Sequence, residues 1–443
     1  MTILALSSGS GISGVAVIRV SGSEAKNILK LITKKKLPQP RRATLLELNN
    51  INTSELIDEA IVLWFPGPNS YTGEDMVEFH VHGSKSVILE LQNTILNTKK
   101  CRIADPGEFT KLAFINGKIN LLKAEGIGDL IASETEIQKK QALNIIKGKS
   151  HHKFNELREK LLKILSHVEA KIDFPDEDLS EDILNTIKNN TLKVENEIIK
   201  ILEDDKVGQQ IREGYKIAIV GPTNSGKSSL INYFAKKEIA IVSEIAGTTR
   251  DVLETHLNFD GYPVIISDTA GIRESKDIIE KEGIKLALNK AEKADLRLVV
   301  IEPKNLNFLG FLKDLFDENS ILIINKSDLY KIEIPEQIKK LRHVVISIKK
   351  ETNIDKLIFE IKKNLSKSFM KSNNVFITRV RHRKNLEECL LNLKNFRSKN
   401  DEEDFDKAAE DLRLATRNLG SIVGKVDVEE ILASIFNDFC IGK

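Results

Sequence analysis

The chain has 443 residues, of which 67 are basic and 65 acidic, so its formal net charge is only +2. This length allows roughly two to four domains, and the balanced charge excludes bulk electrostatic attraction as the basis for binding nucleic acid or a membrane. The three cysteines show no C-x-x-C pair and no zinc-type spacing with the eight histidines, which favours a reducing compartment. With no signal peptide and no apolar run near the roughly 20 residues that span a bilayer, we expect a cytoplasmic protein that binds no membrane.

The first 118 residues predict a small α+β domain. Residues 14–21, 59–65 and 76–82 are rich in β-branched and aromatic side chains and read as strands, and residues 87–96 read as a helix. This mixture of elements ends near residue 118, and the character of the chain then changes.

From residue 121 the sequence is typical of long, charged helices. One apolar stripe with spacings of three and four consists of Phe154, Leu157, Leu161, Leu165, Val168 and Ile172. The acidic segment 173–178, which contains Pro175, is expected to interrupt this helix before another one over residues 183–204. A sequence pattern typical of helices returns over residues 379–436, so we predict a helical domain in two separated segments with another domain inserted between them.

The insertion contains a phosphate-binding loop, Gly221-Pro-Thr-Asn-Ser-Gly-Lys-Ser228, between a strand-like run over 216–220 and a helix-like run from Ser229. In this pattern the backbone N–H groups surround phosphates, Lys227 reaches the terminal phosphates and the Ser228 hydroxyl binds Mg²⁺. The two glycines allow a backbone path that a side chain would block. The loop predicts an ATP or GTP site.

Three further motifs follow apolar runs in the order expected of a GTPase. Asp268-Thr-Ala-Gly271 follows residues 264–267 and is typical of a switch that senses magnesium and a γ-phosphate. Asn325-Lys-Ser-Asp328 follows residues 322–324, and its Asp can accept from two guanine donors that adenine lacks, which selects GTP. Ser347-Ile-Lys349 follows residues 344–346 and is placed to surround the guanine O6. Since each motif ends a candidate parallel strand, we predict an enzyme that hydrolyses GTP.

Four other segments extend the pattern to the whole chain: residues 65–75, 105–109, 247–251 and the terminal Phe439-Cys-Ile-Gly-Lys443. With them the chain resembles the MnmE (TrmE) family of TrmE-Era-like, tRNA-modifying GTPases. The resemblance implies an N-terminal α+β tetrahydrofolate-binding-like domain that also dimerises (1–118), a discontinuous helical bundle (119–212 and 369–443) and an inserted Ras-like P-loop GTPase domain (213–368). It also implies a homodimer that works with an FAD-binding partner, MnmG (GidA), to add a carboxymethylaminomethyl or aminomethyl group at carbon 5 of the wobble uridine of certain tRNAs.

The resemblance also implies roles for individual residues near the phosphates. Potassium is expected to bind Asn224 with Ser243, Ile245 and Thr248, and Mg²⁺ to bind Ser228 and Thr249. Ile272 stands where many GTPases carry a water-orienting Gln, and Glu280 is expected to order the attacking water instead, with Lys227 as the other catalytic residue. The full set of expected GTP-binding residues is Asn224, Ser225, Gly226, Lys227, Ser228, Ser229, Ser243, Glu244, Ile245, Ala246, Gly247, Thr248, Thr249, Asp268, Thr269, Ala270, Gly271, Asn325, Lys326, Ser327, Asp328, Ser347, Ile348 and Lys349.

In the N-terminal domain the resemblance places a folate at Arg19, Glu78, Lys118 and Lys443, with 5,10-methylene- or 5-formyl-tetrahydrofolate as the one-carbon donor. Basic groups suit the glutamate tail of a folate and a carboxylate suits its pterin. Cys440 is a candidate nucleophile near the uridine, although the sequence supplies no base to activate it. Residues 7–14 lack the Pro and Arg common there in the family, and Ile348 stands where Ala is usual.

Two alternatives belong to other functional classes. A ribosome-assembly checkpoint GTPase would carry an RNA-binding module such as a KH domain, whereas the C-terminal flank here is helical. A GTP-driven structural switch, with all uridine chemistry done by the partner, is compatible with the same motifs.

Overall fold

The computed structural model describes residues 1–9, 11–34, 36–173, 181–237, 254–268, 291–304, 316–330, 334–369, 375–399 and 405–426, together with Leu432, Ile435, Phe436, Phe439 and Gly442. The chain divides into two compact units, each built from segments that are distant in sequence. The first comprises Met1–Gly128, Ile145–Lys163 and Arg413–Lys443, and the second comprises Asp129–Asn144 and Ile164–Leu412.

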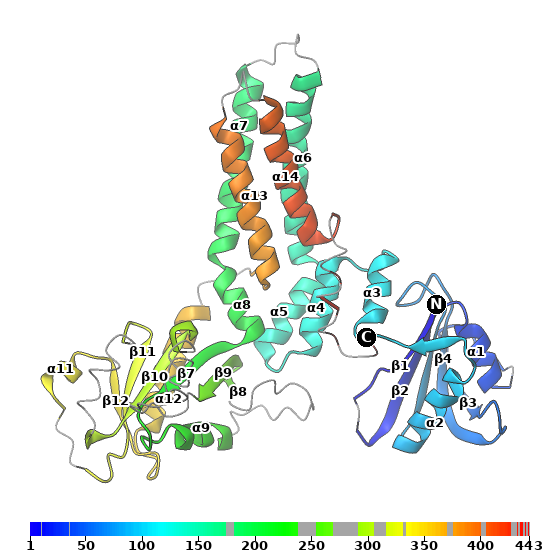
Figure 1. Ribbon diagram of the computed structural model, residues 1–443, viewed down its shortest axis with the longest axis horizontal. Coiled ribbons are helices and arrows are strands. Elements are labelled where there is room, and N and C mark those ends of the chain that lie inside the picture. The colour runs from blue at the N-terminus through cyan, green and yellow to red at the C-terminus, as the bar shows by residue number, and fades with distance from the viewer. Residues whose placement is uncertain are drawn as a thin grey trace, which may run out of the picture. The chain divides into compact units, whose positions relative to one another are not determined.

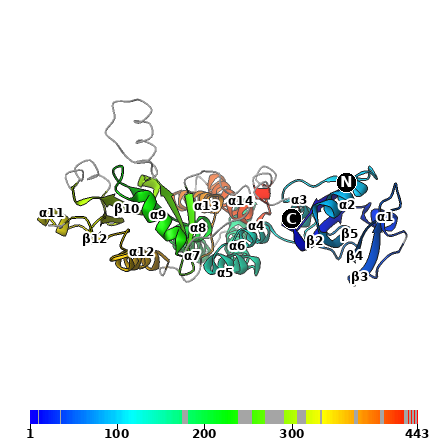
Figure 2. The same cartoon turned by 90° about the horizontal axis from the view of Figure 1, so that it is seen from below.

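The N-terminal part of the first unit is a six-stranded sheet with the order β3-β4-β5-β2-β1-β6. Figure 2 shows β2, β5, β4 and β3 following one another in this order. All pairs are antiparallel except β1 with β6. The strands are β1 (Thr2–Leu6), β2 (Ser13–Ser21), β3 (Thr44–Asn49), β4 (Leu56–Phe65), β5 (Met76–Gly83) and β6 (Cys101–Ile103).

The two faces of this sheet differ because side chains alternate along each strand. On β5, Val77, Phe79 and Val81 are buried in a core that also contains apolar side chains of α1 (Ala25–Ile32) and α2 (Lys85–Leu96). Glu78 and His80, at the alternate positions, lie on the other face of the sheet. That face therefore carries Glu78 and His80, next to a smaller apolar cluster that includes Ile3 and Phe109.

Helices follow the sheet and also end the chain. The remaining helices outside the inserted domain are α3 (Glu108–Ile115), α4 (Leu121–Ile131), α5 (Glu136–Ile146), α6 (Lys149–Asp173), α7 (Glu181–Glu203), α8 (Asp205–Glu213), α13 (Val380–Ser398) and α14 (Phe405–Val423). The apolar stripe predicted for α6 needs correction at two positions: Ile164 is buried in place of Leu165, which is only half-buried, and Ile172 is also only half-buried. With Leu161 and Val168, Ile164 keeps spacings of three and four that hold a stripe on one face.

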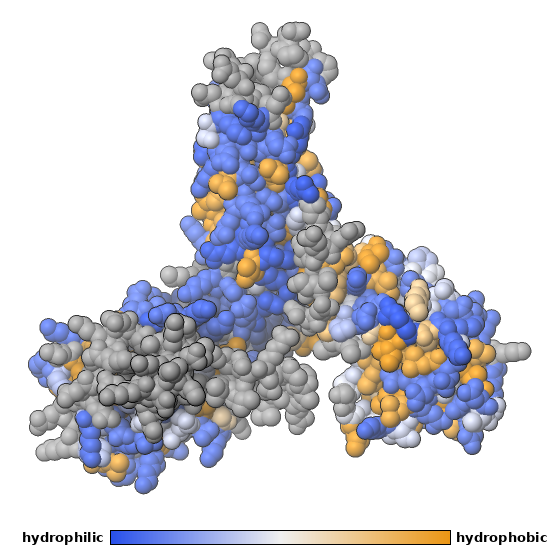
Figure 3. Space-filling model, viewed as in Figure 1, coloured by the Kyte–Doolittle hydropathy of each residue, from blue (hydrophilic) through white to orange (hydrophobic). Residues whose placement is uncertain are grey.

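Helices α7 and α13 pack side by side in the second unit, although the inserted domain separates them in the sequence (Figure 1). Arg397 Nε on α13 donates to Oε1 of the buried Glu195 on α7 at 2.5 Å. Their outer surface is mostly hydrophilic (Figure 3), as expected where the apolar stripes face each other. Among the described helices, none is long and apolar enough to cross a membrane. The packing of α7 against α13 confirms the expected helical bundle built from two parts of the sequence.

The inserted domain is an α/β sheet with the order β12-β11-β10-β7-β9-β8. Its strands are β7 (Tyr215–Val220), β8 (Glu254–Phe259), β9 (Tyr262–Asp268), β10 (Leu296–Ile301), β11 (Ser320–Ile324) and β12 (His343–Val345). All are parallel except β8, which pairs antiparallel with β9. Helices α9 (Lys227–Lys236) and α12 (Ile354–Phe369) contribute to one core against this sheet, and a short helix α11 (Glu336–Lys339) precedes β12. The carboxyl ends of β7, β10, β11 and β12 therefore meet at one edge.

The inserted domain joins the helices through polar contacts within the second unit. Asp129 Oδ1, on α4, accepts from Arg212 Nε at 3.1 Å and from Arg379 Nη2 at 2.7 Å. Arg212 lies on α8, just before β7, and Arg379 directly precedes α13. Gln210 Nε2, also on α8, donates to Asp295 Oδ1 at 2.7 Å, just before β10. The segment that enters the inserted domain and the segment that leaves it are thus both fixed by hydrogen bonds to Asp129.

Candidate functional site

The phosphate-binding loop lies between β7 and α9. Asn224 and Gly226 have φ values of 63° and 104°, so the loop turns through the left-handed region twice before α9 begins at Lys227. The helix therefore begins two residues earlier than expected. Lys227 is 6% exposed, and its Nζ donates to the carbonyl oxygens of Gly221 and Pro222 at 3.1 and 2.9 Å. The ammonium group of Lys227 is thus buried inside the loop, at the amino end of α9, where the helix dipole favours the binding of anions.

Asn325 connects this loop to the opposite side of the site. Its buried side chain donates from Nδ2 to Ser225 O at 2.9 Å, and its Oδ1 accepts from Ile348 N at 3.3 Å. The absence of a side chain at Gly226 makes this contact possible, because a Cβ there would lie 2.2 Å from Asn325 Nδ2. One side chain thus fixes the spacing between the phosphate loop and the loop after β12.

Asp328 is held by the same loop after β12. Ser347 Oγ donates to Asp328 Oδ1 at 2.6 Å and accepts from Lys350 N at 3.1 Å. The Ser347 hydroxyl is the main cause that keeps the pKa of the Asp328 carboxyl below its usual value, with smaller contributions from Lys350 and Lys349. Asp328 is therefore an oriented, ionised acceptor at neutral pH.

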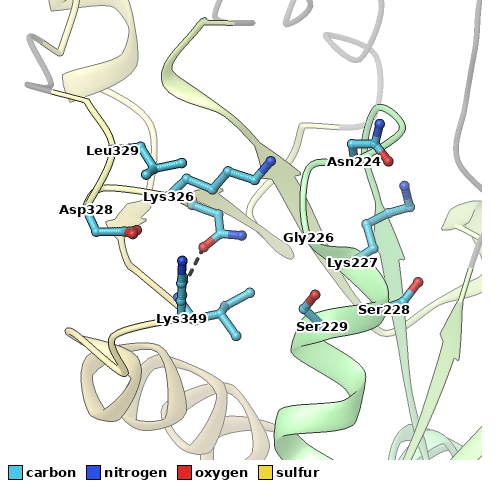
Figure 4. Close-up of a pocket in the computed structure, with 11 residues that line it drawn as sticks. Asn224, Gly226, Lys227, Ser228, Ser229, Lys326, Asp328, Leu329 and Lys349 are labelled. Atoms are coloured by element: carbon cyan, nitrogen blue, oxygen red, sulfur yellow. Dashed lines mark hydrogen bonds between the residues drawn. The ribbon is translucent and has the colours of Figure 1, made fainter.

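These segments surround one cavity of about 720 Å³, within the usual range for small-ligand sites. Asn224, Lys227 and Ser228 lie on one side of it, and Asp328 and Leu329 lie on the other (Figure 4). The cavity is lined by Asn224, Gly226, Lys227, Ser228, Ser229, Asn325, Lys326, Asp328, Leu329, Ile348 and Lys349. An anion-binding end and a carboxylate end face each other, which suits a nucleotide whose phosphates and base need opposite chemistry.

The remaining expected residues of this site are placed as follows. Ser225 and Ser347 are buried behind the cavity lining, and Ser327 N donates to Ile346 O at 3.1 Å. Asp268 ends β9 opposite Ile219 of β7, so its backbone lies next to the strand that leads into the phosphate loop. Outside the described residues lie Ser243, Glu244, Ile245, Ala246, Gly247, Thr248, Thr249, Thr269, Ala270, Gly271 and Glu280, and also Cys440 and Lys443 of the C-terminal motif. Leu329 lines the cavity but was not predicted, since an apolar residue in a polar loop carries no sequence signal for it.

A second polar group lies in the N-terminal domain. Arg19 on β2 and Glu78 on β5 are directly opposite in the antiparallel ladder, and Arg19 Nε and Nη2 both donate to Glu78 Oε1 at 3.0 and 2.7 Å. The rings of Tyr71 and Phe109 lie 5.7 and 5.5 Å from the guanidinium. Arg19 Nη1 also donates to the carbonyl oxygen of Gly442 at 3.4 Å. The structure thus brings Arg19 and Glu78 together and adds the end of the chain.

Lys118 does not join this ion pair among the described contacts. It is exposed, and its Cε lies 3.0 Å from the position that a Cβ would occupy at Gly73, on the loop that also carries Tyr71. His80, which was not predicted, has its Nε2 3.5 Å from Glu78 Oε2. Its position two residues after Glu78 on one strand could have indicated this, because alternate residues share a face.

Comparisons with known proteins identify the family of the chain. A family model described as the MnmE helical domain matches residues 121–440, and one described as the N-terminus of the GTP-binding protein TrmE matches residues 2–118. The tRNA modification GTPases MnmE of Pelagibacter ubique and Rickettsia bellii are 66% and 45% identical to this chain, each over 100% of both chains. Among solved structures, the G domain of the T. maritima FeoB iron transporter is 24% identical over 34% of this chain and 98% of that chain, with a TM-score of 0.27. The matches over the full length lead to one conclusion: this chain belongs to the MnmE family of tRNA modification GTPases.

Proposed function

We propose that this chain binds and hydrolyses GTP in the cavity between the phosphate loop and Asp328, and that hydrolysis serves tRNA modification. The observation that carries the proposal is the convergence of Lys227, Ser228, Asn325 and Asp328 on one cavity, from segments that are up to about a hundred residues apart. Asp328 accepts hydrogen bonds from N1–H and the exocyclic amine of guanine, and residues 347–349 surround the guanine O6. A base without those donors leaves a fixed, ionised carboxylate unpaired, which is unfavourable.

At the phosphate end, the N–H groups of residues 224–229 hold the phosphates at the amino end of α9. Lys227 leaves the loop carbonyls to meet the terminal phosphates, and Ser228 and Thr249 would hold Mg²⁺, with Asp268 as a further acidic group for the ion. The oxygen donors of Ser228 and Thr249 suit this hard cation. Apart from Thr249, which lies in the 247–251 segment, these roles use only side chains of the four motifs.

We further propose that hydrolysis is activated by potassium. Asn224, which lines the cavity at the phosphate end, would bind the ion together with Ser243, Ile245 and Thr248. Potassium would supply a fixed positive charge where negative charge develops during phosphoryl transfer. Glu280 orders the attacking water, because Ile272 stands where a glutamine would do so.

The N-terminal domain is proposed to bind a folate, 5,10-methylene- or 5-formyl-tetrahydrofolate, through Arg19, Glu78, Lys118 and Lys443. The aromatic rings beside Arg19 and its pairing with Glu78 support this, since a pterin needs apolar faces and a carboxylate, and a glutamate tail needs a guanidinium. Such a folate would supply one carbon. Cys440 is retained as a candidate nucleophile.

The proposed biological unit is a homodimer that works with the FAD-binding MnmG and with tRNA. Together they would add a carboxymethylaminomethyl or aminomethyl group at carbon 5 of the wobble uridine. In this proposal residues 1–118 bind folate and dimerise, residues 119–212 and 369–443 form the helical domain, and residues 213–368 form the GTPase domain.

The proposal is tested by steady-state GTP hydrolysis of the full chain in potassium and in sodium at equal ionic strength. Asn224→Ala is expected to abolish potassium stimulation, and Glu280→Ala to lower kcat by about 100-fold or more in either salt. Asn319→Ala is the matched control, because Asn319 is exposed in the turn before β11, at the amino end of that strand. Equal rates of the wild type in both salts would instead support a checkpoint GTPase.

A further inference from the structure

Glu302 is a carboxylate beside the nucleotide cavity that the proposed function does not use. It is the first residue after β10, and Lys326 is the second residue after β11. The two strands are parallel neighbours with Ile301 opposite Ile324, and Asn325 N donates to Ile301 O at 2.9 Å. This register brings the Lys326 ammonium onto Glu302 Oε1 in a direct ion pair.

The ion pair is more enclosed than most surface pairs, since the side chains of Glu302 and Lys326 are 15% and 31% exposed. Lys326 has a φ of 64°, and it lines the cavity beside Asn325. In Figure 4 its side chain runs from the Asp328 side of the cavity toward Asn224, so its methylene groups border the cavity.

A second lysine close to Glu302 is engaged elsewhere. Lys304 Nζ lies over the ring of Tyr330, 4.6 Å from its centroid. The contact with Tyr330 is also the main cause that raises the pKa of Lys304, whereas Glu302 is the smallest of the causes. Glu302 therefore pairs with Lys326, and Lys304 provides a control cation two residues from the same carboxylate.

We propose that Glu302 is a positioning residue for guanine-nucleotide binding, which fixes the Lys326 side chain in the extended form that borders the base. The inference rests on the proposed GTP site. A lysine has several rotatable bonds, and a charge-assisted hydrogen bond freezes them before the nucleotide arrives, which favours binding. Because Lys326 lies on the loop that carries Asp328, and the proposed phosphate contacts come from Lys227 and Ser228 instead, the pair contributes to nucleotide affinity and not to the chemical step.

The test measures dissociation constants of fluorescent GDP and GTP analogues, with KM and kcat, for the full chain. Glu302→Gln is expected to weaken binding about tenfold and to raise KM similarly, while kcat changes less than about twofold. Lys304→Gln is expected to leave all three unchanged. Gln is isosteric with Glu, and unchanged thermal unfolding of Glu302→Gln separates a positioning role from a folding defect.

A double-mutant cycle with Lys326→Met decides whether Glu302 acts through Lys326. If it does, Glu302→Gln has no further effect once Lys326 is Met. Unchanged affinity of Glu302→Gln, or an equal loss in both backgrounds, would overturn the proposal while leaving the GTP site intact. Failure of the wild type to bind either nucleotide would instead overturn the proposed function and, with it, this role.

Discussion

Replacement of Gly226 by alanine tests whether Asn325 sets the spacing of the nucleotide site. The new Cβ would lie 2.2 Å from Asn325 Nδ2, so the amide has to move and its hydrogen bond to Ser225 O is lost. Gly226 also has a φ of 104°, which disfavours any side chain. Gly226→Ala therefore strains the loop and detaches it from the loop after β12.

The expected magnitude follows from these two effects. The left-handed backbone costs about 1 kcal/mol for alanine. Leaving a buried amide without its partner costs about 1 to 3 kcal/mol more, and Asn325 is only 3% exposed. If the nucleotide needs the undistorted loop, the sum of roughly 2 to 4 kcal/mol corresponds to at least about 30-fold weaker binding, at tenfold per 1.4 kcal/mol.

Gly261→Ala is the matched control. Gly261 lies in the hairpin between β8 and β9 with a φ of 90°, and no atom lies within 4 Å of the position that its Cβ would take. It should lose about 1 kcal/mol of folding stability and keep the wild-type affinity for GDP. Fluorescence titration with a GDP analogue, together with thermal unfolding of both variants, makes the comparison. Affinity of Gly226→Ala within threefold of the wild type, or an equal loss in Gly261→Ala, would refute the reasoning.

Three further predictions concern single groups. Because its pKa is lowered, Asp328 stays ionised well below neutral pH, and its contribution is lost only as the pH falls through this lowered value. The preference for GDP over ADP, in which titration of the nucleotide phosphate cancels, should therefore be flat from about pH 8 to pH 5, and Ser347→Ala should move its acid loss to higher pH. A titration in which the two proteins lose this preference at the same pH would contradict this. Burial raises the pKa of the Cys389 thiol, so iodoacetamide at pH 8 should label it only after the chain has been unfolded. Peptide mass spectrometry measures the labelling, and labelling of the native chain at the rate of the unfolded chain would contradict the burial of Cys389. Arg19→Ala should weaken binding of 5-formyl-tetrahydrofolate about tenfold or more and lower tRNA modification, without changing GTP hydrolysis. Replacement of the exposed Arg42 by Ala should change neither folate binding nor tRNA modification. Unchanged folate binding in Arg19→Ala would remove the support for direct one-carbon delivery.

Much of the fold could be predicted because local patterns and tertiary structure agree. The strands before the phosphate loop, Asp268, Asn325 and Ser347 are short apolar runs ended by polar motifs, and such runs predict buried parallel strands. In the inserted domain the sequence did not predict β8 or β10, and in the N-terminal domain it did not predict β1, β3 or β6. Strand β8 carries polar residues such as Asn258 and lies at the sheet edge, where burial imposes less pattern.

The candidate sites were less predictable than the fold because they depend on register. Arg19 and Glu78 were expected to contact a folate, but their direct pairing requires β2 and β5 to align residue for residue, and local sequence does not encode this. The same holds for Glu302, which meets Lys326 only because β10 and β11 are parallel neighbours. The contact of Gly442 with Arg19 joins the two ends of the sequence, and no periodic pattern indicates such a contact.

The carboxylate of Asp129 has a mechanical consequence. Arg212 precedes the first strand of the inserted domain and Arg379 follows its last helix, so the chain enters and leaves this domain at one fixed point. One carboxylate therefore holds the entry and the exit of the inserted domain side by side, and replacement of Asp129 would release both connections at once.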